Sequence, residues 1–157
     1  MYKRQLEELG ELVSVLRRDE EDTAPTKSLP TFDDLDTLID TMRTSGLTVT
    51  WTRSGEPTRL SAPASLAAYR IVQEALTNAA KHGTGSADLN TAWTEDGLTI
   101  RIGNTAASEA GIGSGHGLVG MRERAEANGG TLSTERDGAR FVVDAWLPST
   151  TVREQST

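Results

Sequence analysis

Two stretches of the chain place apolar residues at the three- and four-residue steps of an amphipathic helix. Residues 31–46 begin with Thr31 as an N-cap and carry acidic residues in the first turn. Residues 63–82 begin with Pro63, are rich in Ala, Leu, Ile and Gln, and stop at Gly83. We expect both segments to be helices that pack on a sheet. The packing side of the second helix is lined by Ala68, Tyr69, Val72, Ala75, Leu76, Ala79 and Ala80.

The pattern elsewhere alternates between apolar and polar residues, which is typical of half-buried strands. We expect a strand over 47–55, a hairpin over 88–104 and a second hairpin over 131–148, each hairpin with an Asp-Gly turn. A short helix is predicted over 117–130, whereas 105–116 has no periodicity and is predicted to be a functional loop. This order predicts an α+β sandwich: a mixed or antiparallel sheet of about five strands, covered on one face by about three helices.

Residues 1–18 form a further predicted helix. Its apolar positions Leu6, Leu9, Val13 and Leu16 fit either a helix that packs on a partner or one folded onto its own domain. Residues 19–30 combine an acidic run with two prolines, which indicates a linker. We therefore expect a globular domain over 31–148 and a frayed tail over 149–157. The first helix begins without a cap, so we expect the chain to be a piece of a larger protein.

Composition narrows the classes of function. The 157 residues carry a net charge of −7, which argues against nucleic acid or an anionic membrane as a partner. The absence of cysteine excludes disulfides and thiolate chemistry and fits a reducing compartment such as the cytoplasm. No apolar run approaches the roughly 18 residues of a membrane span, so no membrane segment is expected.

Four polar residues of the long helix fall on one side, within an arc of roughly 100°. They are Glu74, Asn78, Lys81 and His82. One interpretation is an ordinary solvated face, but Asn is a poor residue for a helix interior. The other is a site for a magnesium-bound polyphosphate, with oxygen ligands for Mg²⁺ and a cation for phosphate oxygens. For His82, a phosphate contact and a helix cap are both open.

A glycine-rich segment forms the second candidate. Gly113, Gly115 and Gly117 lead directly into the short helix over 117–130, so backbone amides at its start can approach an anion. The segment matches neither the P-loop nor the Rossmann fingerprint. Taken alone it fits a merely flexible loop, whereas together with the polar side of the long helix it favours nucleotide binding.

These two segments resemble a known family. YRIVQEALTNAAKHG resembles the N-box, and GHGLVGMRERAEANGGTLS the second glycine box, of the ATP-binding domain of two-component sensor histidine kinases. The Gly-His-Gly-Leu form is similar to the subgroup of nitrate sensors and DesK-type kinases. The resemblance covers about residues 31–148 and implies the GHKL (Bergerat) ATP-binding fold, in which Mg·ATP lies between helices and a lid formed here by 105–116.

The resemblance also implies roles for single residues. Asn78 would be the Mg²⁺ ligand and Glu74 the neighbouring catalytic carboxylate, while Asn104 stands where the family has the Asp that accepts the adenine amino group. Ala106 replaces the first glycine of that motif, and Ala139 stands where the family has a threonine. The implied ATP contacts are Asn78, Lys81, His82, Asn104, Gly113, Gly115, His116, Gly117 and Leu118.

As a whole, the resemblance implies a histidine protein kinase domain that uses ATP and Mg²⁺. Its γ-phosphoryl group would pass to a histidine on a dimerisation domain absent from this chain, and then to a response regulator. Residues 1–18 would be the end of that dimerisation helix, and the chain would be the cytoplasmic portion of a membrane-bound bacterial sensor. The alternatives are a related serine kinase of the anti-sigma type and a non-catalytic interaction module with a decayed nucleotide site.

Overall fold

The computed structural model describes residues 29–107 and 116–150, without the side chain of His116. The chain divides into two compact units, Met1–Pro30 and Thr31–Thr157. The predicted helix over 1–18, most of the linker over 19–30, the loop residues 108–115 and the end of the tail lie outside the described residues.

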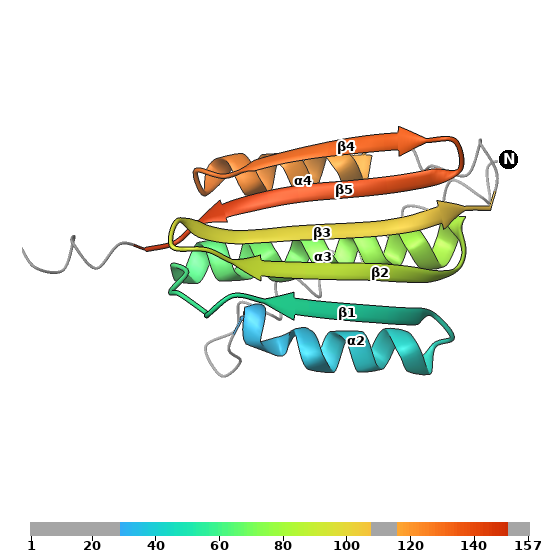
Figure 1. The fold of residues 1–157 in the computed structure, drawn as a ribbon, viewed down its shortest axis with the longest axis horizontal. Helices are drawn as coiled ribbons and strands as arrows, with labels where there is room; N and C mark the ends of the chain where they lie inside the picture. Colours follow the sequence, from blue (N-terminus) through green and yellow to red (C-terminus); the bar gives the residue numbers. More distant parts are fainter. Residues whose placement is uncertain (1–28, 108–115, 151–157) are drawn as a thin grey trace, which may run out of the picture. The chain divides into compact units, whose positions relative to one another are not determined.

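The second unit is a five-stranded sheet with its helices on one face, as Figure 1 shows. Strands run in the order β1-β2-β3-β5-β4, with β1 parallel to β2 and the other neighbours antiparallel. The strands are β1 (Thr48–Ser54), β2 (Gly83–Trp93), β3 (Gly97–Ala106), β4 (Thr131–Asp137) and β5 (Arg140–Pro148). The helices are the 3-10 turn η1 (Phe32–Asp34), α2 (Leu35–Thr44), α3 (Ala62–His82) and α4 (His116–Ala127). The predicted α+β class with a mixed sheet is confirmed.

The core lies between the sheet and α3. On β3, Leu98, Ile100 and Ile102 are buried at every second position, as a strand with one covered face requires. From α3, the buried side chains include Ile71, Val72 and Leu76. The predicted Thr31 cap is confirmed, because Thr31 forms a capping box with Asp34. Ser61, which was not predicted as a cap, accepts from the backbone of Ala64 ahead of α3. Ala80 is exposed, so its assignment to the packing side was wrong; it lies on the flank of the helix.

Several predicted boundaries differ from the structure, and three of them lie at the ends of the segments that form the candidate site. Strand β2 begins at Gly83 instead of residue 88, because Gly83 also pairs with β3. The register of this pairing shifts between Gly83 and Ala87, where Gly85 takes a φ of 100°. At the other end of the pairing, β3 continues through Ala106, so the loop begins later than predicted. Helix α4 begins one residue earlier than predicted, at His116.

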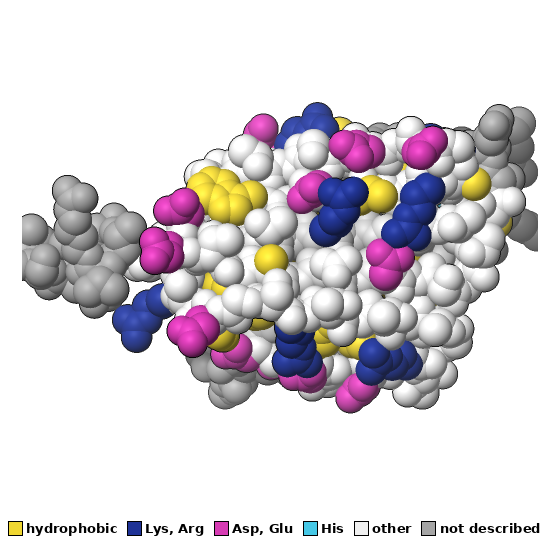
Figure 2. All heavy atoms as spheres, viewed as in Figure 1, with side chains coloured by type: hydrophobic (Ala, Val, Ile, Leu, Met, Phe, Trp, Pro, Cys, Tyr) yellow, Lys and Arg dark blue, Asp and Glu magenta, His cyan; other side chains and the backbone are white. Residues whose placement is uncertain are grey.

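The sheet face without helices is polar. Figure 2 shows Lys and Arg side chains interspersed with Asp and Glu over this face, with few hydrophobic side chains.

At each of the two outer strands, an arginine from the adjacent helix donates to a backbone carbonyl. Arg43 of α2 donates to the Val49 carbonyl of β1 at 2.7 and 3.2 Å. Arg122 of α4 donates to the Leu132 carbonyl of β4 at 3.3 Å.

Candidate nucleotide site

The polar side of α3 is partly covered. Glu74, Asn78 and His82 are half-buried, whereas Lys81 is exposed. A fully solvated ladder would leave all four exposed, so this side of the helix faces other parts of the protein. Among the described residues, none forms a hydrogen bond with the side chain of Asn78.

Glu74 meets the start of α4. A Cβ atom built on Gly117 would overlap Oε1 of Glu74 and would lie 3.1 Å from its Cδ. Only glycine therefore permits this approach while the carboxylate keeps its place. Acidic groups are stabilised at a helix N-terminus, where several backbone amides have no partner within the helix. The structure thus brings one residue of each predicted segment into contact.

The C-terminal end of α3 meets the ends of two other segments. The backbone N–H of Ala107 donates to the His82 carbonyl at 2.8 Å, and that of Ala106 donates to the Ala139 carbonyl at 2.7 Å. The cap residue Gly83 is extended, with φ −95°, and its N–H donates to the Ala79 carbonyl. Gly83 therefore ends the helix without a left-handed conformation, and the end of β3 is fixed against α3 and the β4–β5 turn.

Asn104 lies at this junction. It continues the buried row of Leu98, Ile100 and Ile102 on the helix-facing side of β3, and 8% of its surface is exposed. A Cβ built on Gly83 would lie 2.9 Å from the Asn104 amide nitrogen. The other buried polar residue, Thr91, accepts a bond from the Trp51 indole at 3.0 Å. No described residue donates to or accepts from the Asn104 amide.

The amide of Asn104 is nevertheless reachable from outside. In the part of the chain that the structure describes, no fully buried side-chain nitrogen or oxygen lacks a hydrogen-bond partner. Since the Asn104 amide has no partner there, the small exposed fraction of this residue includes its amide atoms. Buried polar groups are normally paired. The end of β3 therefore presents an unpaired amide at an opening beside the end of α3.

The predicted loop and the first residues after it divide into three groups. Thr105 and Ala106 are part of β3, because they pair with Arg140 and Gly83, so the predicted loop start at Thr105 was wrong. Gly113, Gly115 and the side chain of His116 lie outside the described residues. Leu118 of α4 is half-buried and packs against the core, whereas the next residue, Val119, is 56% exposed.

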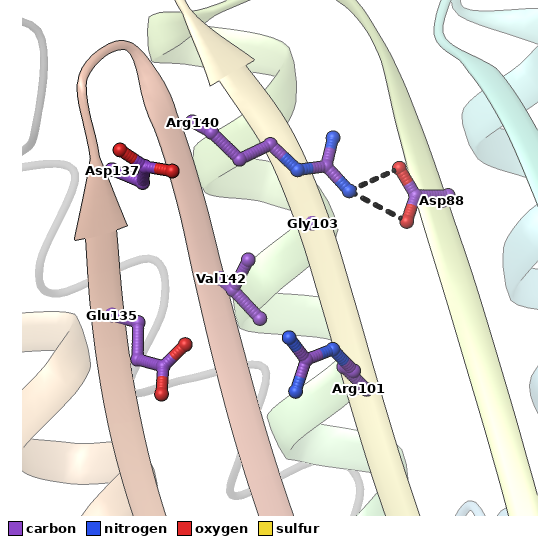
Figure 3. Close-up of a pocket in the computed structure, with 7 residues that line it drawn as sticks. All are labelled: Asp88, Arg101, Gly103, Glu135, Asp137, Arg140 and Val142. Carbon is purple, nitrogen blue, oxygen red and sulfur yellow. Dashed lines mark hydrogen bonds and ion pairs between the residues drawn. The ribbon is translucent and has the colours of Figure 1, made fainter.

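A polar hollow on the opposite face of the sheet was not predicted. It has a volume of about 210 Å³ and contains a bidentate ion pair, with Arg140 Nη2 at 2.7 and 2.8 Å from the Asp88 carboxylate oxygens (Figure 3). The Arg140 side chain crosses β3 directly over Gly103, where a Cβ would overlap the guanidinium. A glycine inside a strand is the signal that could have revealed this crossing. The hollow is lined by Asp88, Arg101, Gly103, Glu135, Asp137, Arg140 and Val142.

The donor set on α3 fits magnesium. Mg²⁺ keeps several waters and takes one or two protein ligands together with phosphate oxygens. The Glu74 carboxylate and the Asn78 amide oxygen, one turn apart on the same side of α3, are oxygen donors of this kind. Among the described residues, no cluster of three or more His, Cys, Asp or Glu side chains could hold a metal alone. The arrangement therefore suits a metal that arrives with a phosphate ligand.

Sequence relatives identify the group of proteins. No protein-family model matches the chain. The sensor histidine kinase LnrJ of Bacillus subtilis is 33% identical over 109 residues, 68% of this chain and 27% of LnrJ. UhpB of Salmonella typhimurium, a signal transduction histidine-protein kinase/phosphatase, is 37% identical over 81 residues, 50% of this chain and 16% of UhpB. The chain thus spans only about a quarter and a sixth of these two relatives.

Solved structures agree on the fold. The Acinetobacter baumannii histidine kinase AdeS superposes with a TM-score of 0.61 at 15% identity, covering 94% of this chain and 82% of that chain. In the part that the structure describes, no helix has both the length and the apolar composition to cross a membrane. Sequence relatives and fold together show that the chain belongs to the sensor histidine kinases and has the fold of their ATP-binding domains.

Proposed function

We propose that this chain is the catalytic domain of a sensor histidine kinase and that it binds Mg·ATP between α3 and the start of α4. The carrying observation is the contact between Glu74 and the backbone of Gly117. It places the amide-rich start of a helix, which favours anions, beside a line of oxygen donors, which favours a cation. A metal-bound triphosphate is the ligand that satisfies both.

Each residue of the polar line has a role in this proposal. The Asn78 oxygen would hold the metal, and the Glu74 carboxylate would orient water or assist at the metal. Lys81 and His82 would contact phosphate oxygens further along α3, and Gly117 and Leu118 would meet the triphosphate at the start of α4. When bound, Mg²⁺ neutralises charge on the phosphates. The rest of catalysis is positioning, because phosphoryl transfer leaves little covalent chemistry to the protein.

The remaining parts of the reaction lie beyond the described fold. We propose that residues 1–18 belong to the dimerisation helix, that the acceptor histidine lies on that dimerisation domain, and that a response regulator then receives the phosphoryl group. The chain would act in the cytoplasm as part of a membrane-bound sensor. The low share of LnrJ and UhpB that this chain spans is consistent with such a multidomain parent.

The substitution Asn78→Ala tests the metal-binding role. We expect Mg·ATP affinity to fall below detection by calorimetry, while the melting temperature stays equal or rises slightly. Stability is preserved because Asn78 has no hydrogen bond to a described residue and Ala is the better helix former. Asn90→Ala, on the exposed face of β2, is the matched control and should leave affinity unchanged. Unchanged affinity in the Asn78→Ala variant would refute the assignment.

A decayed nucleotide site is the second candidate. The observations that favour it are Asn104 and Ala106, which replace the Asp and the glycine of the motif that contacts adenine in the family that the chain resembles. The two candidates differ in a thermal-shift experiment with Mg·ATP. A functional site raises the melting temperature by mass action once ATP exceeds its dissociation constant. No shift at several millimolar ATP would support the interaction module and reject the kinase.

A further inference from the structure

We propose that the base subsite at Asn104 accepts 6-oxo purines as well as adenine, so that this domain binds inosine triphosphate with an affinity close to that for ATP. The proposal rests on the proposed nucleotide function of the site. Asn104 combines three properties: it is 8% exposed, its amide reaches an opening, and no described residue bonds to that amide.

The surroundings of Asn104 suit the edge of a flat, largely apolar ring. On the same face of β3, its neighbours two residues away are Ile102 and Ala106, and both are buried. At the end of α3, Gly83 has no side chain where a Cβ would lie 2.9 Å from the amide nitrogen. Pockets for small ligands are mostly apolar and carry a few polar groups that set orientation. The Asn104 amide is a polar group of this kind.

An amide differs from a carboxylate in having both a donor and an acceptor. An ionised carboxylate only accepts hydrogen bonds, whereas the Asn side chain carries an acceptor oxygen and a donor NH₂ group. Adenine presents a donor at position 6 and an acceptor at N1, and a 6-oxo purine presents the reverse. A half-turn of the amide exchanges its donor and acceptor. Asn104 can therefore make two hydrogen bonds with either edge. An aspartate would make one in each case, because it accepts from the 6-amino group of adenine or from the N1–H of a 6-oxo purine and donates to neither.

The absence of a bonding neighbour makes that half-turn inexpensive. If another side chain bonded to one end of the amide, turning it would leave a buried donor or acceptor unpaired, which costs about 1–3 kcal/mol. Within residues 29–107 and 116–150, no residue imposes such an orientation on Asn104. The bond to the base therefore sets the orientation, and both classes of base gain it equally.

The test compares Mg·ATP with Mg·ITP, which differ only at the 6-position and the attached N1 proton. For the unsubstituted chain we expect dissociation constants within about tenfold of each other by calorimetry. For Asn104→Asp we expect both nucleotides to weaken by a similar factor, because the carboxylate accepts from the 6-amino group of ATP or from the N1–H of ITP but donates to neither. Asn90→Asp on the exposed face of β2 is the control and should leave both affinities unchanged.

The outcomes distinguish a failure of this inference from a failure of the proposed nucleotide-binding function. If the chain binds ATP more than about tenfold tighter than ITP, the inference is wrong and ATP binding stands. If neither nucleotide binds, the proposed function fails and the inference fails with it. Should Asn104→Asp not fold, Asn104→Ala replaces it: it is expected to weaken ATP and ITP by the same factor, and unequal weakening would contradict the proposal.

Discussion

The contact between Glu74 and Gly117 predicts the effect of one added methyl group. In Gly117→Ala the new Cβ overlaps Oε1 of Glu74, with Cδ at 3.1 Å and Cγ at 3.4 Å. All three atoms belong to a flexible side chain, so the carboxylate turns away while the backbone stays. Overpacking costs typically 1–3 kcal/mol and a side chain forced off its rotamer about 0.5–1.5 kcal/mol. We therefore expect a cost of about 1–2 kcal/mol.

A second glycine of the same helix supplies the reference. Replacing glycine by alanine in a helix gains up to about 1 kcal/mol in propensity. At Gly120 a Cβ would meet only the end of the Arg124 side chain, at 3.1 Å, so Gly120→Ala reports that gain with little overlap. By urea denaturation, Gly117→Ala is expected to be about 1–2 kcal/mol less stable than Gly120→Ala. Its affinity for Mg·ATP is expected to fall about tenfold, since Glu74 leaves its position.

A double-mutant cycle gives the decisive measurement. In the background Glu74→Ala the overlapping carboxylate is absent, so Gly117→Ala should then be as benign as Gly120→Ala. The interaction energy between positions 74 and 117 is expected to be about 1–2 kcal/mol, well above the roughly 0.3–0.5 kcal/mol within which independent substitutions add. An interaction energy inside that margin would show that the two residues do not meet, and would remove the main support for the nucleotide site.

Two further predictions concern the open face and the histidines. Asp88→Asn is expected to lower the free energy of unfolding by less than about 1 kcal/mol, because both side chains of its ion pair with Arg140 are about 40% exposed. The loss should be smaller still at 1 M salt, which screens exposed charges. A larger loss that does not depend on salt, measured by urea denaturation, would contradict this. When the chain is incubated alone with γ-labelled ATP, we expect it to take up no label. His82 is the last residue of α3 and His116 the first residue of α4, so neither lies on a dimerisation helix. Label mapped to either histidine would contradict the proposed division of the reaction.

The elements that depend on local sequence were predictable. The long helix α3, the strand alternation and the two acidic-Gly hairpin turns are encoded within a few residues, and the structure confirms each. The predicted start of β2 was wrong because its first residues, Gly-Thr-Gly-Ser, have the composition of a turn. They become a strand through pairing with β3, as Gly83 opposite Ala106 shows. That pairing is a tertiary interaction that local pattern does not encode.

The candidate site was predictable in its residues and less so in its contacts. Asn78 was notable because asparagine is unfavourable inside a helix, and the helical period placed Glu74 on the same side. The alternation along β3 also places Asn104 in line with Ile102. The approach of Glu74 to Gly117 joins residues 43 positions apart, and no local pattern predicts it. The crossing of Arg140 over Gly103 likewise depends on the order of β3 and β5.

The arginines at the two sheet edges determine how this domain meets other proteins. An outer strand with unpaired backbone groups invites a strand from another molecule. Here Arg43 occupies the Val49 carbonyl on β1 and Arg122 the Leu132 carbonyl on β4, so an incoming strand would have to displace a charge-assisted hydrogen bond at either edge. We expect these two bonds to disfavour edge-to-edge polymerisation, and we expect partners to approach through helices and loops.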